Sequence, residues 1–505
     1  MTVIVQNNSL NIFEEIYKKS KKTVMCHGVF DLLHLGHIRH FKDAKKLGEI
    51  LIVSVTADKF VNKGPGRPYF NLSQRMEAIA SLNCVDYVVP SNSEDAIKIL
   101  NIVKPKIYCK GEDYKKHSLD ITKKIKKEIS VVKKYKGRIY YTNNITFSSS
   151  NLINKSFDTF NENQTKTILN IKDFLKKNDI EEYFKNLKTT NVLLIGEAII
   201  DQYIFCSPLG KSSKDPILTF KQISKKNYIG GSLAIAKQLS PYCKKINLIT
   251  LSIKDREYKK FVKKNLPNNV NIIYVDKKNS KTIVKKRYVD FNSNNKLIGI
   301  YDLEDDYFDN KFHKKITNTI LNQVNKNNVT IISDYGHNLM DKKIVNLLKK
   351  KSKFISANVQ LNSANTQKHS INNYTNVDSL IINEAELRSH LRNTDSELKK
   401  LIKKICKDLD LKFCIVTCGK QGAYLYNSKK NKFFYSAAFA KNVVDKVGSG
   451  DAMFSLISIF LSVKADENIS LFIGSLAAAI SVENQANSSF LNEVILKKTI
   501  KHILA

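Results

Sequence analysis

Two histidines three residues apart are the first candidates for chemistry in this chain. His34 and His37 lie in CHGVFDLLHLGH, residues 26–37, where a strand pattern ends at a glycine and a helical pattern begins. This spacing puts both imidazoles on one face of a helix N-terminus, where backbone N–H groups and the helix dipole attract phosphate. Gly28 and Gly36 allow the backbone to approach a nucleotide closely. The segment therefore predicts a site that stabilises charge on a triphosphate.

A glycine-rich turn near the other end of the chain predicts a second phosphate site. The segment NVVDKVGSGDAMF, residues 442–454, places the turn Gly448–Gly450 after a strand expected to end near Asp445, and Asp451 opens an apolar helix. Successive N–H groups of such a turn form an anion hole. The aspartate beside it can accept a proton from a sugar hydroxyl while the hole holds a phosphoryl group. The alternative is an ordinary strand–loop–helix corner with an aspartate cap.

The elements that must position these residues alternate between strands and helices. In the first part of the chain we expect strands at 23–29, 50–56, 87–90 and 107–109, and helices at 35–46, 73–82 and about 95–103. A second series begins with a strand at 191–195 and continues with strands at 246–251, 330–333, 379–382 and 412–417. Alternation at this pitch predicts α/β folds with parallel, helix-covered sheets. The polar stretch 155–190 is expected to be a helical or partly flexible connector.

Composition limits the class of protein. The 505 residues are 42% hydrophobic and 26% charged, which excludes a disordered chain. No stretch reaches the roughly 18 apolar residues of a membrane-spanning helix. The start, MTVIVQNNSLNIFEE, shows no leader pattern, so we expect a cytoplasmic protein with no membrane partner. Eight cysteines without CxxC spacing predict buried reduced thiols rather than a metal site.

The formal net charge of +36 raises the question of nucleic-acid binding. Only eight of the 83 basic residues are arginine, whereas base readout and bidentate phosphate recognition favour arginine. We therefore expect a solvated lysine-rich surface, small anionic substrates and no nucleic-acid partner. Nucleic-acid binding through the lysines is the alternative.

The first part of the chain resembles the cytidylyltransferase-like nucleotidylyltransferases. GVFDLLHLGHIRHFKDAKKLG, VSVTAD, KGPGRP, NLSQRMEAIASLNCVDYVV, CKGEDY and, weakly, TFSSSNLI follow the motif order of that family. The likeness spans residues 22–154 and is nearest to the adenylyltransferase domain of bifunctional heptose-phosphate enzymes. The glycerol-phosphate cytidylyltransferases come next. It implies a Rossmann-like nucleotidylyltransferase domain over residues 1–154.

The resemblance also implies residue roles. His34 and His37 would contact nucleotide phosphates, Asp31 would hold the turn, and Arg75 would anchor a phosphate from a helix. Lys63 and Arg67 would neutralise phosphates of substrate or pyrophosphate. Further residues of the nucleotide and phosphate site would be Gly28, Phe30, Lys110, Gly111, Asp113, Ser148, Ser149 and Ser150. The implied reaction is attack of a sugar-1-phosphate oxygen on the α-phosphate of a nucleoside triphosphate, which needs positioning and charge stabilisation rather than a general base.

The rest of the chain resembles the PfkB/ribokinase sugar kinases. The matching segments are IGEAIID, IGG, NEAE, VTCGKQGA and GSGD, and PLGKSSKDPIL and SDYG are similar to the heptose-phosphate kinases. The likeness implies a ribokinase-like α/β domain over 191–505, with a transferase-then-kinase order that is reversed relative to the heptose enzymes. Asp451 would be the catalytic base. The other implied site residues are Gly448, Ser449 and Gly450 in the anion hole, Thr417, Gly419 and Gly422 at ATP, Asp201, Gly230 and Gly231 at the sugar, and Asn383 and Glu386 organising Mg²⁺.

Three positions depart from the kinase pattern. Ala234 stands where heptose kinases carry a sugar-binding asparagine, and Glu197 stands where an aspartate is usual. The segment ANVQLNSAN replaces an Asp-Pro pair found in many of these kinases.

These observations predict a bifunctional enzyme of activated-sugar synthesis. It would use ATP and Mg²⁺ to phosphorylate a sugar or sugar phosphate, and it would transfer a nucleotidyl group, AMP in preference to CMP, to a sugar-1-phosphate. A homodimer is expected by analogy with the superfamily. The alternatives are a polyol-phosphate cytidylyltransferase that uses CTP, fused to a kinase, and a regulatory protein that binds nucleotide and sugar without turnover.

Overall fold

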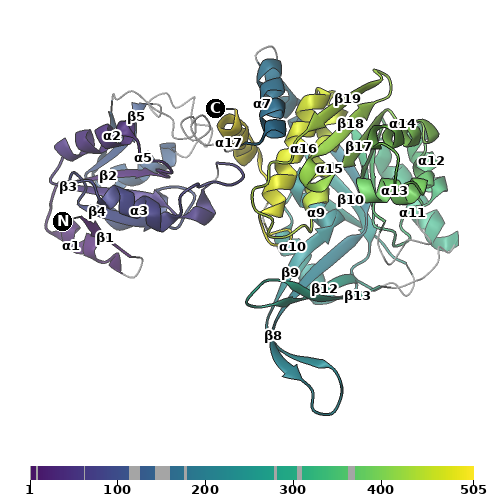
Figure 1. The fold of residues 1–505 in the computed structure, drawn as a ribbon, viewed down its shortest axis with the longest axis horizontal. Helices are drawn as coiled ribbons and strands as arrows, with labels where there is room; N and C mark the ends of the chain where they lie inside the picture. The colour runs from purple at the N-terminus through teal and green to yellow at the C-terminus, as the bar shows by residue number, and fades with distance from the viewer. Residues whose placement is uncertain are drawn as a thin grey trace. The chain divides into compact units, whose positions relative to one another are not determined.

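The chain folds into two units in the computed structural model, which describes residues 2–6, 9–61, 63–112, 125–142, 160–175, 179–277, 281–303, 310–361, 370–488 and 490–504. The N-terminal unit consists of residues 1–161 together with 494–505, and the C-terminal unit of residues 162–493 (Figure 1). The helices found within the expected connector therefore fall in the C-terminal unit. Among the described residues, no helix has the length and apolarity needed to cross a membrane.

The N-terminal unit is built on a six-stranded parallel sheet in the order β1-β4-β3-β2-β5-β6. The strands are β1 Val3–Ile4, β2 Thr23–Gly28, β3 Ile50–Thr56, β4 Tyr87–Ser91, β5 Ile107–Gly111 and β6 Arg138–Thr142. The helices are α1 Ile12–Lys18, α2 Leu35–Lys46, α3 Leu72–Ala80, α4 Ile97–Val103 and α5 Ile125–Lys134, with a 3₁₀ turn η2 at Asp58–Phe60.

Helices cover both faces of this sheet. Apolar side chains of α2 and α3 join one core cluster, and those of α1, α4 and α5 join another on the opposite face. The strand order reverses beside β2, and in such sheets ligands bind outside the carboxyl ends of the strands at the reversal. The HLGH segment follows β2 there, so the predicted Rossmann-like fold and the position of its first motif are confirmed.

The C-terminal unit contains a nine-stranded sheet in the order β11-β10-β7-β14-β15-β16-β17-β18-β19, of which only the last two pairings are antiparallel. Its strands are β7 Asn191–Gly196, β10 Lys245–Leu251, β11 Val270–Val275, β14 Val329–Asp334, β15 Ile355–Val359, β16 Ser379–Asn383, β17 Phe413–Thr417, β18 Ala423–Asn427 and β19 Lys432–Ser436. Near-continuous apolar runs such as VLLI in β7 suit strands buried on both faces.

Ten helices and two 3₁₀ turns are described around this sheet. They are α7 Glu162–Leu175, α8 Ile180–Thr189, α9 Ser232–Leu239, α10 Arg256–Asn265, α11 Asn310–Val324, α12 Lys342–Lys351, α13 Glu384–Leu391, α14 Leu398–Asp408, α15 Ser449–Ser462 and α16 Glu467–Val482, with η5 Ile371–Tyr374 and η6 Gly419–Gln421. Helices α11 to α14 share one core with the sheet, and α15 packs against α16 and α9. The last helix, α17 Glu493–Ile503, begins at the boundary of the units.

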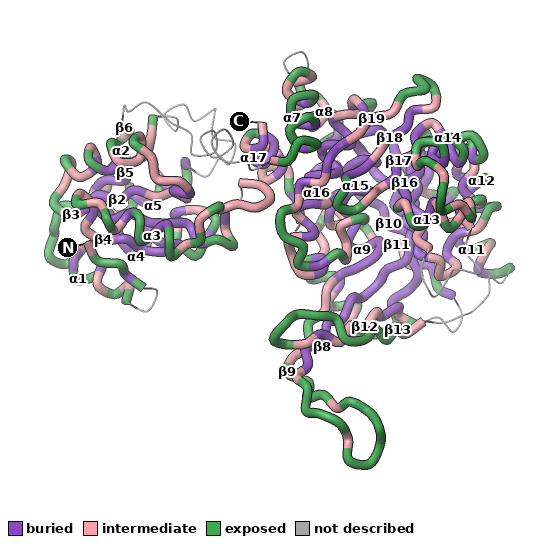
Figure 2. Tube along the Cα trace, viewed as in Figure 1, coloured by how far each residue is buried: buried purple, intermediate pink, exposed green. Residues whose placement is uncertain are grey.

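A second, four-stranded sheet, in the order β13-β12-β8-β9, was not expected from the sequence. Its strands are β8 Ala198–Lys211, β9 Leu218–Gly231, β12 Ile283–Asp290 and β13 Lys296–Asp302. The hairpin of β8 and β9 extends well past the other strands, and its tip is exposed (Figures 1 and 2). Only Glu197 separates the end of β7 from the start of β8, so the two strands form one apolar run in the sequence.

The strand expected to end near Asp445 is absent from the described segment that contains this residue. Strand β19 ends at Ser436, and an irregular segment runs from there to Gly448, the N-cap residue of α15. The helix therefore begins at Ser449, two residues before Asp451.

Candidate active sites

The two histidines of HLGH lie together at the start of α2. His34 is the extended N-cap residue and makes no side-chain capping hydrogen bond, and its ring stacks on that of His37 with centroids 3.8 Å apart. Burial and the charge of Lys63 lower the pKa of His34. Burial and the neighbouring His34 and Lys63 lower the pKa of His37 to about 3. Both rings are therefore neutral near pH 7 and can donate N–H groups to phosphate oxygens.

Phe30 explains why a glycine suits position 28. Phe30 has a positive φ of 50°, and its ring lies 2.9 Å from the position that a Cβ on Gly28 would take. The same ring packs edge-on against His37, with centroids 5.2 Å apart. Gly28 and Phe30 thus form the surface next to His37. The sequence had predicted this segment only as a place where the backbone approaches a nucleotide closely.

Asp31 fixes the loop of residues 63–70, which carries Lys63 and Arg67 and is called the basic loop below, rather than the turn in which Asp31 itself lies. It accepts hydrogen bonds from the backbone N–H groups of Tyr69 (2.7 Å) and Phe70 (3.1 Å), and it pairs with Arg67 at 3.2 Å. Lys63 lies on the same loop, and burial lowers its pKa to about 8 despite the charge of Asp31. The charge of Lys63 acts on both histidines, and Arg67 lies close enough to Lys63 to lower its pKa further.

Arg75 has a different environment from the one expected. Its guanidinium group is almost fully buried, donates to the carbonyl oxygens of Val29 (2.5 Å), Phe70 (2.9 Å) and Thr56 (2.9 Å), and pairs with Asp58 at 2.5 Å. These partners tie β3, the loop after β2 and the basic loop together. The contacts favour a structural role for Arg75 over the predicted phosphate contact, because protein acceptors bind four of its five N–H groups.

Lys110 also has protein partners in place of the expected nucleotide. Its side chain is buried, and its ammonium nitrogen lies 3.7 Å from a carboxylate oxygen of Glu128. Gly111 does have open space where a side chain would stand, as a pocket border requires. The other predicted residues, Asp113, Ser148, Ser149 and Ser150, lie outside the described residues.

The end of the chain contributes residues to the basic loop that sequence reasoning missed. Thr499 of α17 lies 3.1 Å from the position of a Cβ on Gly64. Burial and the charges of Lys63 and Arg67 lower the pKa of His502 to about 3. No local pattern links positions so far apart in the chain.

The second site is a cavity of about 240 Å³ in the C-terminal unit. It lies between the N-terminus of α15 and the four-stranded sheet, and Asp201, Gly231, Gly448, Gly450 and Asp451 all line it. The structure thus brings the predicted base, anion hole and sugar residues to one cavity.

Asp451 is the buried acid of this cavity. Its Oδ1 accepts a hydrogen bond from the Tyr335 hydroxyl (2.9 Å), and the amide nitrogen of Gln360 lies 3.4 Å away. Burial raises the pKa of Asp451 to about 6, the Tyr335 hydrogen bond acts in the opposite direction, and the charge of Asp201 raises it further. An acid with this pKa is mainly ionised at pH 7 and is suited to accept a proton.

The anion hole depends on one glycine. Gly448 has a φ of 85°, and a Cβ there would overlap the side-chain oxygen of Asn487. A Cβ on Gly450 would meet open space, so the first turn of α15 is accessible from the cavity. Asp445 holds the preceding loop because it accepts from the backbone N–H of Val447 (3.1 Å) and from the hydroxyl of Tyr203 (2.6 Å).

The side of the cavity lined by Asp201, where the sequence predicted a sugar, carries two cations that sequence reasoning missed. Asp201 lies against Gly230, where a Cβ would overlap its carboxylate, and it pairs with Arg287. Lys285 also lines the cavity, and burial lowers its pKa. Both cations come from β12, which pairs with β8 so that Lys285 lies beside Asp201. The alternating positions of Lys285 and Arg287 in KKRY place both side chains on one face of β12. This could have indicated the two cations only if the pairing of β12 with β8 had been known.

Two buried carboxyl groups, those of Glu197 and Asp334, lie next to the segment that carries Tyr335, a residue of the cavity lining. Glu197 accepts from the backbone N–H groups of Tyr335 (3.1 Å) and His337 (3.0 Å), and Asp334 accepts from the hydroxyl of Tyr374. Burial and the charge of Asp334 raise the pKa of Glu197 to about 7. The glutamate that departs from the family pattern thus holds the backbone that presents Tyr335.

The predicted ATP and magnesium residues lie along the next strands. Thr417 ends β17 beside Asn383 at the end of β16, and Gly419 and Gly422 have positive φ angles of 57° and 91°. Asn383 and Glu386 form a reciprocal capping box at α13. These residues, all within the described part of the chain, do not line the cavity that contains Asp451.

Ala234 is buried in α9 and, like its neighbour Ser232, does not line the cavity, whereas Gln360 does. The cavity side chains therefore differ from those the heptose-kinase pattern places around a sugar.

The fold is that of an α/β protein with two domains, each built on a mainly parallel sheet. The pfkB family of carbohydrate kinases matches residues 189–493, and a cytidylyltransferase-like family matches residues 25–155. The chain therefore belongs to the pfkB family of carbohydrate kinases, with a cytidylyltransferase-like domain ahead of the kinase domain. The predicted family and the predicted order of the domains are confirmed.

Curated relatives match over part of the chain. "Bifunctional protein HldE" of a Nitratiruptor species is 38% identical over 129 residues, which are 25% of this chain and 28% of the relative. The protein of the same name from Hydrogenovibrio crunogenus is 42% identical over 99 residues, 19% of this chain and 21% of the relative. The chain thus spans less than a third of the length of either relative.

Solved structures support the kinase fold. Phosphofructokinase-2 from Escherichia coli in complex with substrates and products matches with a TM-score of 0.51 at 12% identity, over 62% of this chain and 99% of that chain. A single-residue mutant of the same enzyme matches with a TM-score of 0.50 at 13% identity, over the same shares of the two chains. At these identities the likeness shows the ribokinase-like fold alone.

Proposed function

We propose that the chain is a bifunctional enzyme of activated-sugar synthesis. The kinase domain phosphorylates a sugar or sugar phosphate with ATP, and the cytidylyltransferase-like domain transfers a nucleotidyl group to a sugar-1-phosphate. The observation that carries this proposal is the meeting of Asp451, Gly448 and Asp201 in one cavity. The enzyme would act in the cytoplasm, where ATP and sugar phosphates are available.

In the kinase reaction Asp451 accepts the proton of the sugar hydroxyl as the oxygen attacks the γ-phosphorus of ATP, and ADP leaves. The N–H groups of the Gly448–Gly450 turn and the N-terminus of α15 stabilise the negative charge of the transferring group. Asp201 and the backbone at Gly230 and Gly231 orient the sugar. The pKa of Asp451, about 6, keeps most of the base ionised at pH 7.

In the transferase reaction an oxygen of the sugar-1-phosphate attacks the α-phosphorus of the nucleoside triphosphate, and pyrophosphate leaves. The neutral imidazoles of His34 and His37 donate hydrogen bonds to the phosphates, and Lys63 and Arg67 neutralise charge on the leaving group.

The nucleotide favoured for the transferase is ATP, and hence the group transferred is AMP. The motifs of this domain are nearest to the adenylyltransferase domain of bifunctional heptose-phosphate enzymes, and the matching relatives are named bifunctional proteins. CTP is the second candidate, favoured by the description of the family that matches this domain.

The kinase uses Mg²⁺ in this proposal, with Asn383 and Glu386 as the residues that would organise it. Oxygen ligands suit this ion, which keeps several of its waters. The carboxylate of Glu386 already accepts backbone N–H groups from Asn383 (2.8 Å) and Leu361 (3.3 Å), so it fits a role through bound water. When bound, the ion would neutralise phosphate charge.

The kinase substrate is anionic in this proposal. The cavity lining holds the cations Lys285, Arg287 and Lys446 but only two carboxylates, those of Asp201 and Asp451. A phosphate on the sugar would therefore improve the charge balance. A phosphatase acting between the two steps would be required if that phosphate were absent from the final product.

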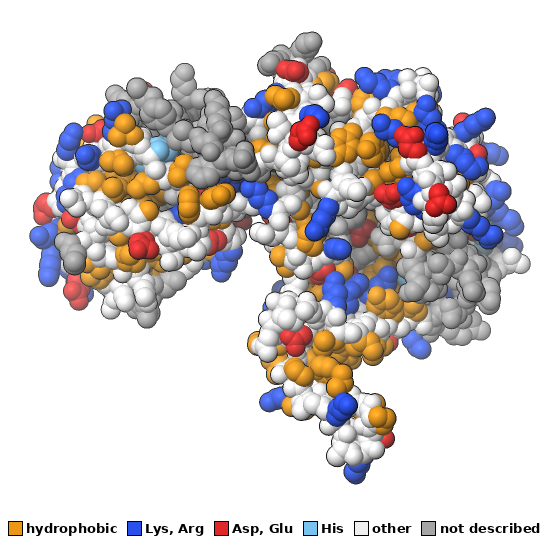
Figure 3. All heavy atoms as spheres, viewed as in Figure 1, with side chains coloured by type: hydrophobic (Ala, Val, Ile, Leu, Met, Phe, Trp, Pro, Cys, Tyr) orange, Lys and Arg blue, Asp and Glu red, His pale blue; other side chains and the backbone are white. Residues whose placement is uncertain are grey.

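We also propose a homodimer formed through the four-stranded sheet. Its outer strands expose Phe220 and Ile223 on β9 and Leu297, Ile298 and Ile300 on β13, and apolar side chains gather over this region in Figure 3. A second copy of the chain would cover these apolar side chains.

The decisive experiment incubates the full chain with ATP or CTP and a panel of sugars, sugar phosphates and sugar-1-phosphates, and reads ADP and pyrophosphate separately. We expect ADP release with a sugar or sugar phosphate and pyrophosphate release with a sugar-1-phosphate. Tight binding of nucleotide and sugar, without release of ADP or pyrophosphate, would instead indicate a regulatory protein that binds these ligands without turnover.

A further inference from the structure

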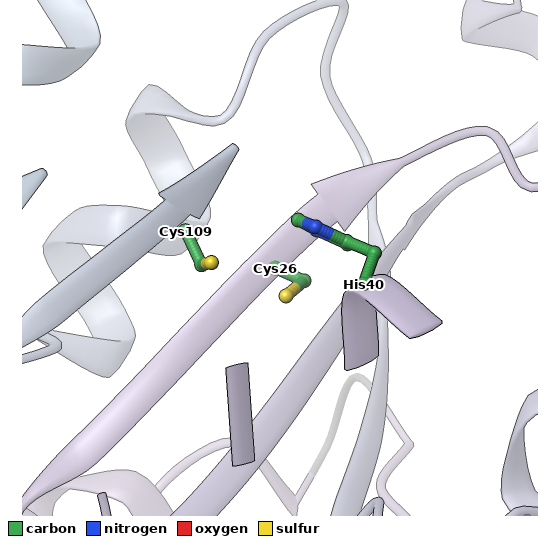
Figure 4. Close-up of side chains that lie close together, drawn as sticks. All are labelled: Cys26, His40 and Cys109. Atoms are coloured by element: carbon green, nitrogen blue, oxygen red, sulfur yellow. The ribbon is translucent and has the colours of Figure 1, made fainter. Parts of the chain in front are cut away.

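Two cysteines and a histidine far apart in the sequence converge inside the N-terminal unit. Cys26 on β2 and Cys109 on β5 are register partners on neighbouring parallel strands, so both thiols point to the same face of the sheet. Helix α2 covers that face and supplies His40 (Figure 4). The two sulfur atoms and a ring nitrogen of His40 all lie within 4.8 Å of one another.

The hydrogen bonds of His40 prepare it as a ligand. Its Nδ1 lies 2.8 Å from the hydroxyl oxygen of Thr142, and that hydroxyl is 3.4 Å from the carbonyl oxygen of Lys110. If Thr142 donates to the carbonyl, its oxygen accepts from Nδ1–H, which leaves the Nε2 lone pair for a metal.

The surroundings suit a soft or borderline dication. Both cysteines are fully buried in an apolar cluster that includes Phe41, Ala44 and Val53. Two thiolates, one neutral imidazole and a dication sum to zero charge, which avoids the high cost of an unpaired charge in such a core.

We propose that Cys26, Cys109 and His40 bind Zn²⁺. Zinc takes thiolate sulfur at about 2.3 Å and imidazole nitrogen at about 2.0 Å in tetrahedral sites, so bound sulfurs lie roughly 3.8 Å apart. Small side-chain movements would close the cluster around the ion. The bound ion would join β2, β5 and α2, the three elements that present Gly28, Gly111 and His37, and would fix the frame of the transferase site.

Cobalt is a suitable probe because it reports thiolate ligation by its absorption spectrum. The full chain is reduced, stripped with a chelator and titrated with Co²⁺, and Zn²⁺ is then added in competition. We expect one Co²⁺ per chain, a thiolate-to-metal charge-transfer band, loss of the band on addition of Zn²⁺, and a Zn²⁺-dependent rise in melting temperature.

Matched variants locate the ligands. Cys26→Ala and Cys109→Ala should lose the band, and His40→Gln should weaken Co²⁺ binding by at least about tenfold. Cys84→Ser should keep the band, since Cys84 is half-buried and does not belong to the group formed by Cys26, His40 and Cys109. Far-ultraviolet circular dichroism of each variant, compared with that of the wild-type chain, shows that the variant is folded. The proposal is overturned if folded, reduced wild-type protein gives no band, or if the double variant C26A/C109A retains it.

Discussion

The hydroxyl of Tyr335 donates a hydrogen bond to Oδ1 of Asp451 across 2.9 Å, and both side chains are buried beside the cavity of the kinase domain. Tyr335 follows β14 directly, and its backbone N–H donates to Glu197. The proposed base, Asp451, is therefore held by the phenol of Tyr335, whose own position depends on the buried carboxyl group of Glu197.

Replacing Asp451 by asparagine should reduce sugar phosphorylation by about 10²–10⁴-fold, because the amide cannot accept the proton of the hydroxyl. ADP release in the presence of the best sugar substrate measures this step. Pyrophosphate release by the other domain serves as the internal control and should stay unchanged. Wild-type kinase turnover in the variant would show that another group is the base.

Tyr335→Phe should shift the acid limb of the kinase pH profile upward. The lost hydrogen bond had lowered the pKa of Asp451, so its pKa should rise above about 6, by about one unit for a bond of ordinary strength. Activity should therefore fall most below pH 7 and recover at higher pH. Tyr374→Phe, which removes a hydroxyl from Asp334 instead, is the matched control, and an equal shift in both variants would contradict a specific link to Asp451.

His37→Ala should lower pyrophosphate release by about 10²–10³-fold, the usual effect of losing one donor to developing charge. The kinase reaction of the same protein should keep its rate. A variant that releases pyrophosphate normally would remove the role assigned to the histidine pair.

Lys285→Met and Arg287→Met should each raise the KM for a sugar phosphate by roughly 10–100-fold, as expected for a lost charge-assisted hydrogen bond. The KM for the same sugar without its phosphate should change much less. Equal effects of the Lys285 and Arg287 substitutions on both substrates would argue against phosphate recognition there.

The preference among sugar phosphates should not single out a heptose. Because Ala234 offers no hydrogen bond and lies outside the cavity lining, we expect heptose 7-phosphate not to exceed other sugar phosphates clearly in kcat/KM.

Ile298→Lys should convert a dimer to monomers, since it places a charge in the apolar surface of β13. Sedimentation velocity on the full chain measures the change. Leu169→Lys, at an exposed position of α7, is the matched control and should leave the dimer intact. A wild-type protein that sediments as a monomer would contradict the proposed interface.

Local sequence patterns were sufficient to predict the elements and the turns that carry the two candidate sites. The bounds expected for α2 and β3 agree with the structure, because apolar periodicity and glycine positions act over a few residues. The same is true of the HLGH turn and of Gly448, where a positive φ and a close neighbour require glycine. Both family assignments depend on motifs of this local kind.

The directions of long side chains, and the contacts between residues distant in the sequence, could be read only from the folded chain. Arg75 looked like a phosphate ligand, yet three backbone carbonyls and Asp58 surround it. Lys285 and Arg287 reach the sugar side because β12 pairs with β8, and Cys26 meets Cys109 because β2 pairs with β5. Each of these pairings joins segments that are distant in the chain, and no pattern within either segment encodes its partner, since register follows from the packing of the whole sheet.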